Sequence, residues 1–203
     1  MRPDAENSKG EPLILSLKGK SAVIRLSRPA ARNPLSVTTL DALEETISTL
    51  ISGSDINKLI FTGTGDVFAS GANIREVATL ARETAEGFAL RGQRLMQKIA
   101  DAPFLTIAAV NGYCMGGGLD LALACRLRIA SASAVFAHPG ARLGIITGWG
   151  GTQRLPRLIG TARALEFFTT ARQMNCVEAY EIGLVDQICD PVIDGALDYS
   201  TVI

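Results

Sequence analysis

The chain of 203 residues contains one histidine, His138, and its four cysteines show no CxxC spacing. Zinc sites are built from clustered histidine and cysteine ligands, so no metal site is expected. Cysteines scattered in this way are typical of reduced thiols rather than of a disulfide framework. The cysteine pattern therefore predicts a cytoplasmic protein without a bound metal.

Excess charge and long apolar runs are also missing. Lys and Arg number 20 and Asp and Glu number 20, which leaves a formal net charge of zero. Bulk electrostatics therefore indicates neither a nucleic-acid partner nor a membrane surface. No uncharged apolar run approaches the roughly 20 residues that a membrane helix needs. Residues 1–12 are polar and of mixed charge, so we predict a short disordered lead rather than a secretory signal.

Three common glycine-containing motifs are missing as well. There is no G-x-G-x-x-G after a strand and no G-x-x-x-x-G-K-[ST], so neither a dinucleotide fold nor a nucleotide-phosphate loop is supported. The absence of G-x-S-x-G argues against a serine nucleophile of the hydrolase type. The composition, 47% hydrophobic, is that of an ordinary globular protein. With no linker in view, we expect one domain over residues 13–203.

What the chain does contain is a glycine run, Gly116-Gly117-Gly118, between an apolar strand-like segment (104–110) and a segment of strong helix formers (119–124). Each glycine inside a helix costs about 1 kcal/mol relative to alanine, so the run favours a strand–turn–helix order. A helix start offers unpaired N–H groups to an anion. Asp120 follows Gly117 by three residues and shares its helix face. The stretch fits either a site for enolate chemistry or a packing turn with a surface aspartate.

Strands and helices alternate along the rest of the chain. The patterns predict strands at 13–17, 22–26, 58–63, 104–110, 127–130, 134–137 and 184–188, and helices at 37–51, 88–99, 119–124, 152–159, 162–170 and 177–182. Small or polar residues predict loops at 27–36, 68–76 and 143–151, and a turn at 138–142. Repetition of strand, strand and helix indicates an α/β fold.

Four segments in chain order share their residues with one enzyme family. They are Arg28-Pro29 with Asn33-Pro34-Leu35, the stretch Phe68-Ala69-Ser70-Gly71-Ala72-Asn73-Ile74-Arg75-Glu76, the stretch from Val110 to Asp120, and Gly144-Ile145 with Gly150 to Arg157. Together they closely resemble the enoyl-CoA hydratase/isomerase family, also called the crotonase family. The resemblance covers residues 13–188, and four motifs in order are far more specific than one.

The resemblance implies a crotonase-like spiral of strand–strand–helix units that assembles as homotrimers or hexamers. It implies an acyl-CoA thioester as substrate, with coenzyme A as part of that substrate and no permanently bound cofactor. The thioester oxygen would accept hydrogen bonds from the backbone N–H groups of Ala72 and Gly117, each worth roughly 3 kcal/mol to a developing enolate. The implied substrate and CoA contacts are Asn33, Leu35, Ala69, Ser70, Gly71, Ala72, Asn73, Ile74, Gly116, Gly117 and Gly140.

Departures from the family pattern bear on the reaction. Family hydratases place two glutamates over the substrate, and here those positions hold Asp120 and Gly140. Aspartate withdraws its carboxylate by about 1 Å, and misplacement on that scale can cost about 10²-fold. Gly140 supplies no acid or base. A lone histidine before a proline, His138, is more often structural or on the surface than a base, although its reference pKa allows either role.

Three functions therefore stay open. The first is an enoyl-CoA hydratase/isomerase-family enzyme with Asp120 as acid/base and weak hydratase activity. The second is an isomerase, which needs only one carboxylate to move a proton. The third is a non-catalytic CoA-binding or assembly protein. Relative to the family, the C-terminal helical part is expected to be short or missing.

Overall fold

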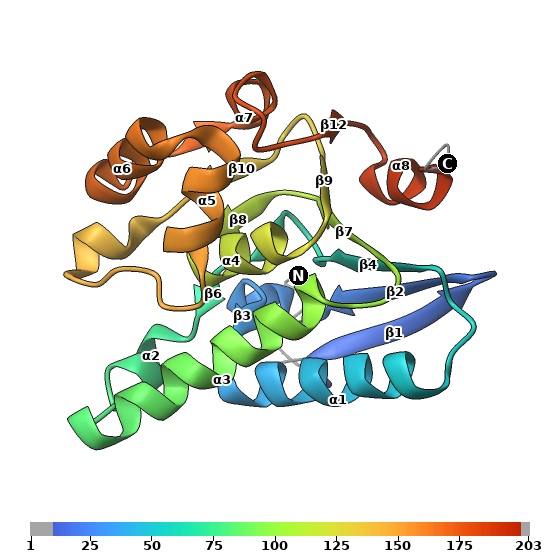
Figure 1. Ribbon diagram of the computed structural model, residues 1–203, viewed down its shortest axis with the longest axis horizontal. Coiled ribbons are helices and arrows are strands. Elements are labelled where there is room, and N and C mark those ends of the chain that lie inside the picture. Colours follow the sequence, from blue (N-terminus) through green and yellow to red (C-terminus); the bar gives the residue numbers. More distant parts are fainter. Residues whose placement is uncertain (1–9, 200–203) are drawn as a thin grey trace, which may run out of the picture.

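The chain builds two sheets by repeating one unit, in which a strand of the first sheet is followed by a strand of the second (Figure 1). The strands β4 (Lys58–Thr62), β7 (Leu105–Val110) and β9 (Leu127–Ala130) lie side by side in one sheet, and β5 (Val67–Ala69), β8 (Tyr113–Met115) and β10 (Val135–Ala137) lie side by side in the other. Each strand of the first set is followed in the chain by one of the second set, and all these pairings are parallel. This confirms the predicted spiral of strand–strand–helix units.

Further strands complete the two sheets and form a third, smaller ladder. The antiparallel hairpin of β1 (Leu13–Lys18) and β2 (Ser21–Leu26) forms one edge of the six-stranded sheet, and β12 (Gln187–Ile188) forms the other. The four-stranded sheet ends with β11 (Met174–Asn175). A separate two-stranded ladder joins β3 (Pro34–Leu35) to β6 (Gly71–Ala72). The computed structural model describes residues 10–199.

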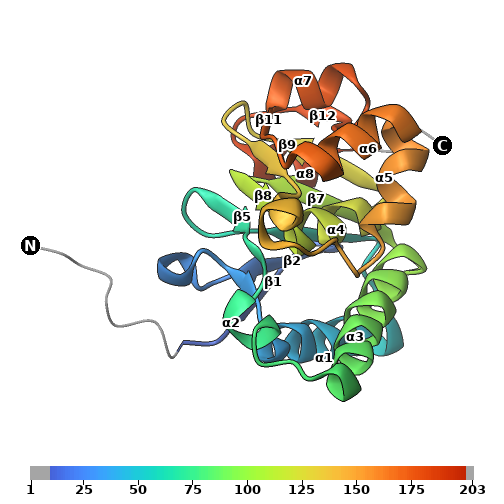
Figure 2. The ribbon, with the colours of Figure 1, turned by 90° about the vertical axis from the view of Figure 1, so that its left-hand side faces the viewer.

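Helices lie on either side of the strands. Figures 1 and 2 show α1 (Val37–Gly53) and α3 (Arg82–Ala100) together on one side, and α5 (Gly151–Ile159), α6 (Thr161–Thr170) and α7 (Cys176–Glu181) on the other. Helix α1 begins as predicted, because the Ser36 hydroxyl accepts a hydrogen bond from the Thr39 N–H.

At the centre lies α4 (Gly117–Ala124), which is buried from Gly118 onward. A helix that is apolar on nearly every face requires such an enclosed position. Its only charged residue, Asp120, is therefore carried into the interior.

The predicted glycine turn needs a correction, because it contains strand β8. The chain reverses at Asn111-Gly112, crosses the second sheet as β8, and only then enters α4 through Gly116, which has φ +52°. At Gly112 an added Cβ would lie 1.9 Å from the Asp66 carbonyl oxygen, so only glycine fits this crossing. A strand of three residues is too short for periodicity to reveal.

Other boundaries also differ. The predicted loop 68–76 contains parts of β5 and β6 and helix α2 (Ile74–Val77), and α3 begins six residues before the predicted Phe88. The last strand is confined to the two residues of β12. Short 3-10 turns occupy η2 (Pro29–Ala31) and η3 (Pro139–Leu143).

A short C-terminal helix follows the last strand, and the sequence patterns did not predict it. Helix α8 (Val192–Asp198) packs on the first sheet through Val192 and Ala196. The Lys58 ammonium on β4 donates hydrogen bonds to the carbonyls of Ala196 at 3.2 Å, Leu197 at 2.5 Å and Tyr199 at 2.9 Å. Cations are favoured at this end of a helix because its carbonyls are otherwise unpaired.

The predicted disordered lead is only partly covered, since residues 1–9 lie outside the described part of the chain. Residues 10–12, the described part of it, contact the loop that follows β2. The Gly10 carbonyl accepts from the Arg28 guanidinium at 3.2 and 3.3 Å, and the Pro12 carbonyl accepts from the Ser27 N–H at 3.1 Å. Within residues 10–199, none of the helices is both long enough and apolar enough to cross a membrane.

Candidate active site

Two backbone segments meet without intervening side chains at β6 and the start of α4. Gly71 has φ +93°, and a Cβ there would lie 2.8 Å from the Met115 carbonyl oxygen and 2.9 Å from the Gly117 nitrogen. A Cβ at Gly117 would lie 3.3 Å from the Ala72 nitrogen. Gly117 is the first residue of α4, so its N–H has no partner four residues back in the helix. The structure therefore brings the backbones of Ala72 and Gly117 together.

A cavity of about 260 Å³ opens over this meeting point. Its wall is mostly apolar, and the two titratable side chains on it are Asp120 and His138. Eight of the predicted site residues line it: Ser70, Gly71, Ala72, Ile74, Gly116, Gly117, Asp120 and Gly140. Four others, Asn33, Leu35, Ala69 and Asn73, do not.

Asn33 supports the site from behind. It is 1% exposed, and its side chain accepts from the Arg28 N–H at 2.9 Å and donates to the carbonyls of Val67 at 2.7 Å and Thr64 at 3.1 Å. These bonds tie the early loop to the segment that leads into β6. In this structure Asn33 acts on the scaffold and makes no contact with the cavity.

The other three residues outside the cavity also have structural contacts. Leu35 is fully buried and pairs with Ala72 across the β3–β6 ladder. Ala69 is fully buried against Gly118, where an added Cβ would lie 2.4 Å from the Ala69 carbonyl oxygen. The Asn73 side chain caps α2 by accepting a backbone N–H. Each of them fixes the backbone around Ala72 or α4.

Asp120 is 1% exposed, so the alternative of a surface aspartate is wrong. Its Oδ2 accepts a hydrogen bond from the Thr147 hydroxyl. Its Oδ1 lies 3.7 Å from Nε2 of His138, which is also buried. Neither of these two facing atoms has a hydrogen-bond partner among the described residues. A Cβ at Gly151 would lie 2.2 Å from Oδ1, so that position admits only glycine.

Burial shifts the pKa values of both side chains. Burial raises the pKa of Asp120 to about 6. The opposite effect, a lowering of this pKa, comes from groups that favour the carboxylate: the Thr147 hydroxyl, the backbone of Trp149 and Gly151, and the charge of Arg154. Burial alone lowers the pKa of His138 to about 4. Near neutral pH the site therefore holds a charged carboxylate of raised basicity beside a neutral imidazole. A base with a pKa close to the operating pH is suited to proton transfer.

Gly140 lies on the cavity wall with its side-chain space already occupied. An added Cβ would lie 2.6 Å from the Ile145 carbonyl oxygen, and the Ile145 N–H donates to the Gly140 carbonyl at 3.0 Å. The obstacle to a larger residue is thus this packed loop, since Gly140 is not among the glycines with a left-handed backbone angle.

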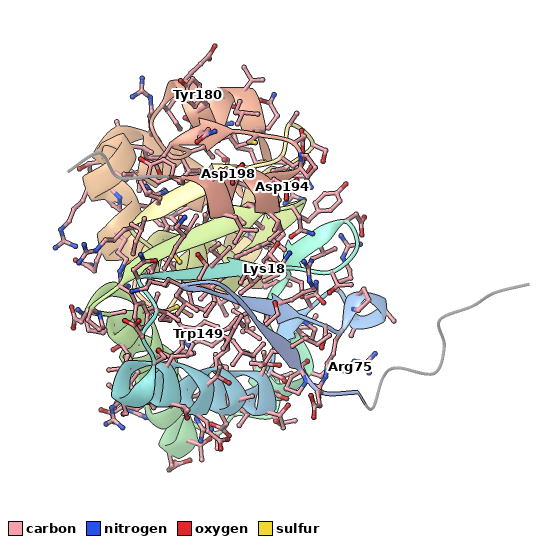
Figure 3. All side chains as sticks on the ribbon, turned by 90° about the vertical axis from the view of Figure 1, so that its right-hand side faces the viewer. Lys18, Arg75, Trp149, Tyr180, Asp194 and Asp198 are labelled. Atoms are coloured by element: carbon pink, nitrogen blue, oxygen red, sulfur yellow. The ribbon has the colours of Figure 1, made fainter. Side chains whose placement is uncertain are left out.

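The sequence patterns did not single out Thr147, Trp149 or Gly151 as site residues. Trp149 is 3% exposed, and Figure 3 shows it in the interior between the strands and the α1 layer. Its ring lies where a Cβ of Gly117 or Gly92 would be, so it backs the cavity. The one available signal was the only tryptophan of the chain within a glycine-rich loop. Among the described residues, no group of three His, Cys, Asp or Glu side chains could hold a metal ion.

A model of the enoyl-CoA hydratase/isomerase family matches residues 18–196 of the chain. The chain belongs to this family. The crotonyl-CoA hydratase of Syntrophomonas wolfei is 40% identical over 182 residues, 89% of this chain and 70% of that protein. The short-chain-enoyl-CoA hydratase of Clostridium acetobutylicum is 37% identical over 180 residues, 88% of this chain and 69% of that protein.

Solved structures agree with this placement. An enoyl-CoA hydratase from Bacillus anthracis superimposes with a TM-score of 0.88 at 34% identity, covering 92% of this chain and 74% of that one. Pseudomonas aeruginosa DspI also reaches a TM-score of 0.88, at 33% identity, over 96% of this chain and 80% of its own. The enoyl-CoA hydratase/isomerase family and its spiral fold, expected from four sequence segments, are both confirmed.

The buried carboxylate predicts a cost in stability. The pKa of Asp120 is about 6 when folded and 3.8 as its ordinary value, so ionised Asp120 costs on the order of 3 kcal/mol of folding free energy above pH 6. The folded form binds the extra proton between pH 6 and 4, so this cost disappears as the pH falls through that window. Asp120→Asn should therefore unfold at higher urea concentration than the native chain at pH 7, and the difference should vanish by about pH 4.

The control is Asp55→Asn, whose carboxylate is 93% exposed in a surface ion pair with Lys20. Such pairs contribute about 0–1 kcal/mol, so no comparable stabilisation is expected. His138 also loses stability as the pH falls below 6.5, so the comparison at pH 7, where the imidazole is neutral in the native and Asp120→Asn chains alike, isolates the effect of the carboxylate. Equal stability of the two at pH 7 would contradict the costly burial of the charge.

Proposed function

We propose that this enoyl-CoA hydratase/isomerase-family enzyme moves a proton on an enoyl-CoA thioester, with Asp120 as its acid/base. The observation that carries the proposal is a buried carboxylate on the wall of a largely apolar cavity that also exposes the meeting point of Ala72 and Gly117. The N–H groups of these two residues are proposed to bind the thioester oxygen. Fixed donors aimed at developing negative charge in a water-poor site are among the strongest sources of catalysis.

One carboxylate is sufficient for this proton transfer. Asp120 takes a proton from a carbon next to the conjugated system, the C–H bond breaks, and the electron pair stays in the dienolate, whose charge rests on the thioester oxygen. The same carboxyl group returns the proton to a different carbon, which moves the double bond. Because Gly140 offers no second carboxylate, the site favours isomerisation over the addition of water.

Hydration is the second candidate function. It is favoured by relatives that are named crotonyl-CoA hydratase and short-chain-enoyl-CoA hydratase. Water addition requires one group to activate water and a proton for the α-carbon, so Asp120 alone would do both tasks less readily. Cytoplasmic location, assembly as a homotrimer or hexamer, and the lack of a permanently bound cofactor stay predictions.

Binding of an acyl-CoA should stabilise the fold. A saturated short acyl-CoA, which has no double bond to react, should add about 2.7 kcal/mol at 100 times its Kd. For a chain of this length that raises Tm by about 5–10 °C. Thermal unfolding with increasing ligand measures the shift, and no shift at saturation would contradict acyl-CoA binding.

Two alanine variants make the binding test specific. Gly117→Ala puts a methyl group 2.5 Å from the Trp149 ring and beside the Ala72 nitrogen, so it should remove the ligand-induced shift. Gly148→Ala lines the same cavity but meets nothing nearer than Ala89 at 4.0 Å, so it should keep the shift. Each variant is compared with its own ligand-free Tm, which separates lost binding from lost stability.

Turnover should depend on Asp120. In a panel of enoyl-CoAs, Asp120→Asn should lower kcat by about 10²-fold or more while the ligand-induced Tm shift remains, because the amide cannot accept the proton. Product analysis distinguishes a moved double bond from an added hydroxyl. Unchanged turnover would assign Asp120 a purely structural role. A native chain that binds but converts no thioester would instead support the non-catalytic alternative.

Hydration should be limited by the glycine at position 140. We expect the native chain to hydrate a short enoyl-CoA at less than about 10 s⁻¹, a typical enzyme rate. Gly140→Glu and Gly140→Ala both bring a Cβ against the Ile145 carbonyl, and only the first adds a carboxylate. Both should be less stable than native, and Gly140→Glu should hydrate up to about 10²-fold faster than Gly140→Ala. Equal rates in the two variants, or a fast native hydratase, would show that no second carboxylate is needed.

A further inference from the structure

We propose that His138 shares with Asp120 the proton that the enzyme moves, so that the two side chains work as one acid/base pair. The inference deepens the proposed function and rests on the role given there to Asp120. His138 acts through the carboxylate, so it is a positioning residue.

The geometry of two unpartnered atoms carries this inference. Oδ1 of Asp120 and Nε2 of His138 are buried, lie 3.7 Å apart, and have no hydrogen-bond partner among the described residues. More than nine in ten buried polar groups in proteins are hydrogen-bonded, so a facing pair without partners needs an explanation. In the proposed pair the neutral imidazole carries its own proton on Nδ1, so Nε2 and the charged carboxylate are both acceptors and form no bond with each other. One added proton would satisfy both atoms at once.

The surroundings keep the two atoms facing. The Thr147 hydroxyl holds Oδ2, which leaves Oδ1 for the histidine. The imidazole packs against two rings of α6, with centroids 6.1 Å from Phe167 and 5.0 Å from Phe168. Since both side chains line the cavity, a proton held between them remains within reach of a bound substrate.

The proton balance needs no additional reactant. When Asp120 takes a proton from the substrate carbon, the C–H bond breaks, an O–H bond forms at Oδ1, and the electron pair stays in the enolate. The proton then bridges Oδ1 and Nε2 after the atoms close by roughly 0.5–1 Å to hydrogen-bonding distance. Return of the proton to carbon reverses these steps. The histidine thus stabilises the protonated intermediate form of the site.

Few other titratable groups act on the pair within the described part of the chain. Arg154 of α5 favours the charged carboxylate. The Cys114 thiol of β8 lies near Asp120, and burial together with that carboxylate raises the pKa of the thiol well above its ordinary value, which keeps it neutral. Helix α6 contributes the two phenylalanines. The proton-dependent change near pH 6 is therefore assigned to Asp120, and the change near pH 4 to His138.

The chain has one histidine, so its imidazole signals in an NMR spectrum are unambiguous. In the ligand-free native chain, these signals should change near pH 6, where Asp120 titrates, as well as near pH 4, where the ring itself is protonated. In Asp120→Asn the change near pH 6 should disappear. Identical titration curves for the two proteins would overturn the proposal, and this measurement does not depend on turnover.

Thr147→Val serves as the matched control because Thr147 binds the other carboxylate oxygen. Loss of that hydrogen bond should move the upper transition of the His138 signals to higher pH without abolishing it. Loss of this transition in Thr147→Val would overturn the assignment of the shared proton to Oδ1.

The pH profile of turnover tests the role in catalysis. In His138→Gln the amide can donate to Oδ1 and favour the charged carboxylate, so the acid limb of kcat/KM should move to lower pH, and kcat should fall at least about 10-fold with KM little changed. His138→Phe, which suits the neighbouring phenylalanines, guards against a folding defect and should also lower kcat. Native kcat and an unshifted acid limb in His138→Phe, with only Tm changed, would mark a purely structural histidine and overturn the proposal. If the NMR coupling is found but no thioester is converted, the proton pair stands and the proposed function fails.

Discussion

The site depends on the close approach of two backbones, at β6 and at the start of α4. Side-chain atoms at Gly71, Gly117 or Gly118 would collide with main-chain atoms or with the Trp149 ring. If backbone N–H groups are to act together on one oxygen, the segments that carry them must come this close. The β3–β6 ladder, the Asn33 hydrogen bonds and the buried helix α4 all hold this approach in place.

A second constraint follows from the enclosed position of α4. A helix without a solvent face carries any charged residue into the interior, and Asp120 is charged there at an energetic cost. The cost is reduced by Thr147 and Arg154, yet it is not removed, because the pKa of the carboxyl group remains raised. In the proposed reaction the same low dielectric would strengthen the interaction of the carboxylate with the proton that it removes. Under that proposal, stability and reactivity are opposed in one side chain.

Much of the fold could be predicted from local patterns. The hairpin, α1, β4, β7 and the helices α5, α6 and α7 follow apolar periodicities that extend over five or more residues. The strands β3, β5, β6, β8 and β11, each of two or three residues, escaped prediction, since so few positions carry no periodicity. Helix α8 was missed because part of its support is Lys58, which lies about 140 residues earlier in the chain. Of the predicted site residues, eight lie on the cavity wall and four lie outside it.

The sequence by itself determined the family, the repeated strand–strand–helix unit and the small residues around Ala72 and Gly117. It also determined that Asp120 and Gly140 stand where family hydratases have two glutamates. Only the tertiary structure decided that Asp120 is buried, that it faces His138, and that the Ile145 carbonyl fills the space beside Gly140. The reason is physical. Local patterns predict whether a segment is a helix or a strand and which of its faces is apolar. The burial of Asp120, its raised pKa and its position opposite His138 arise where different turns of the spiral pack together.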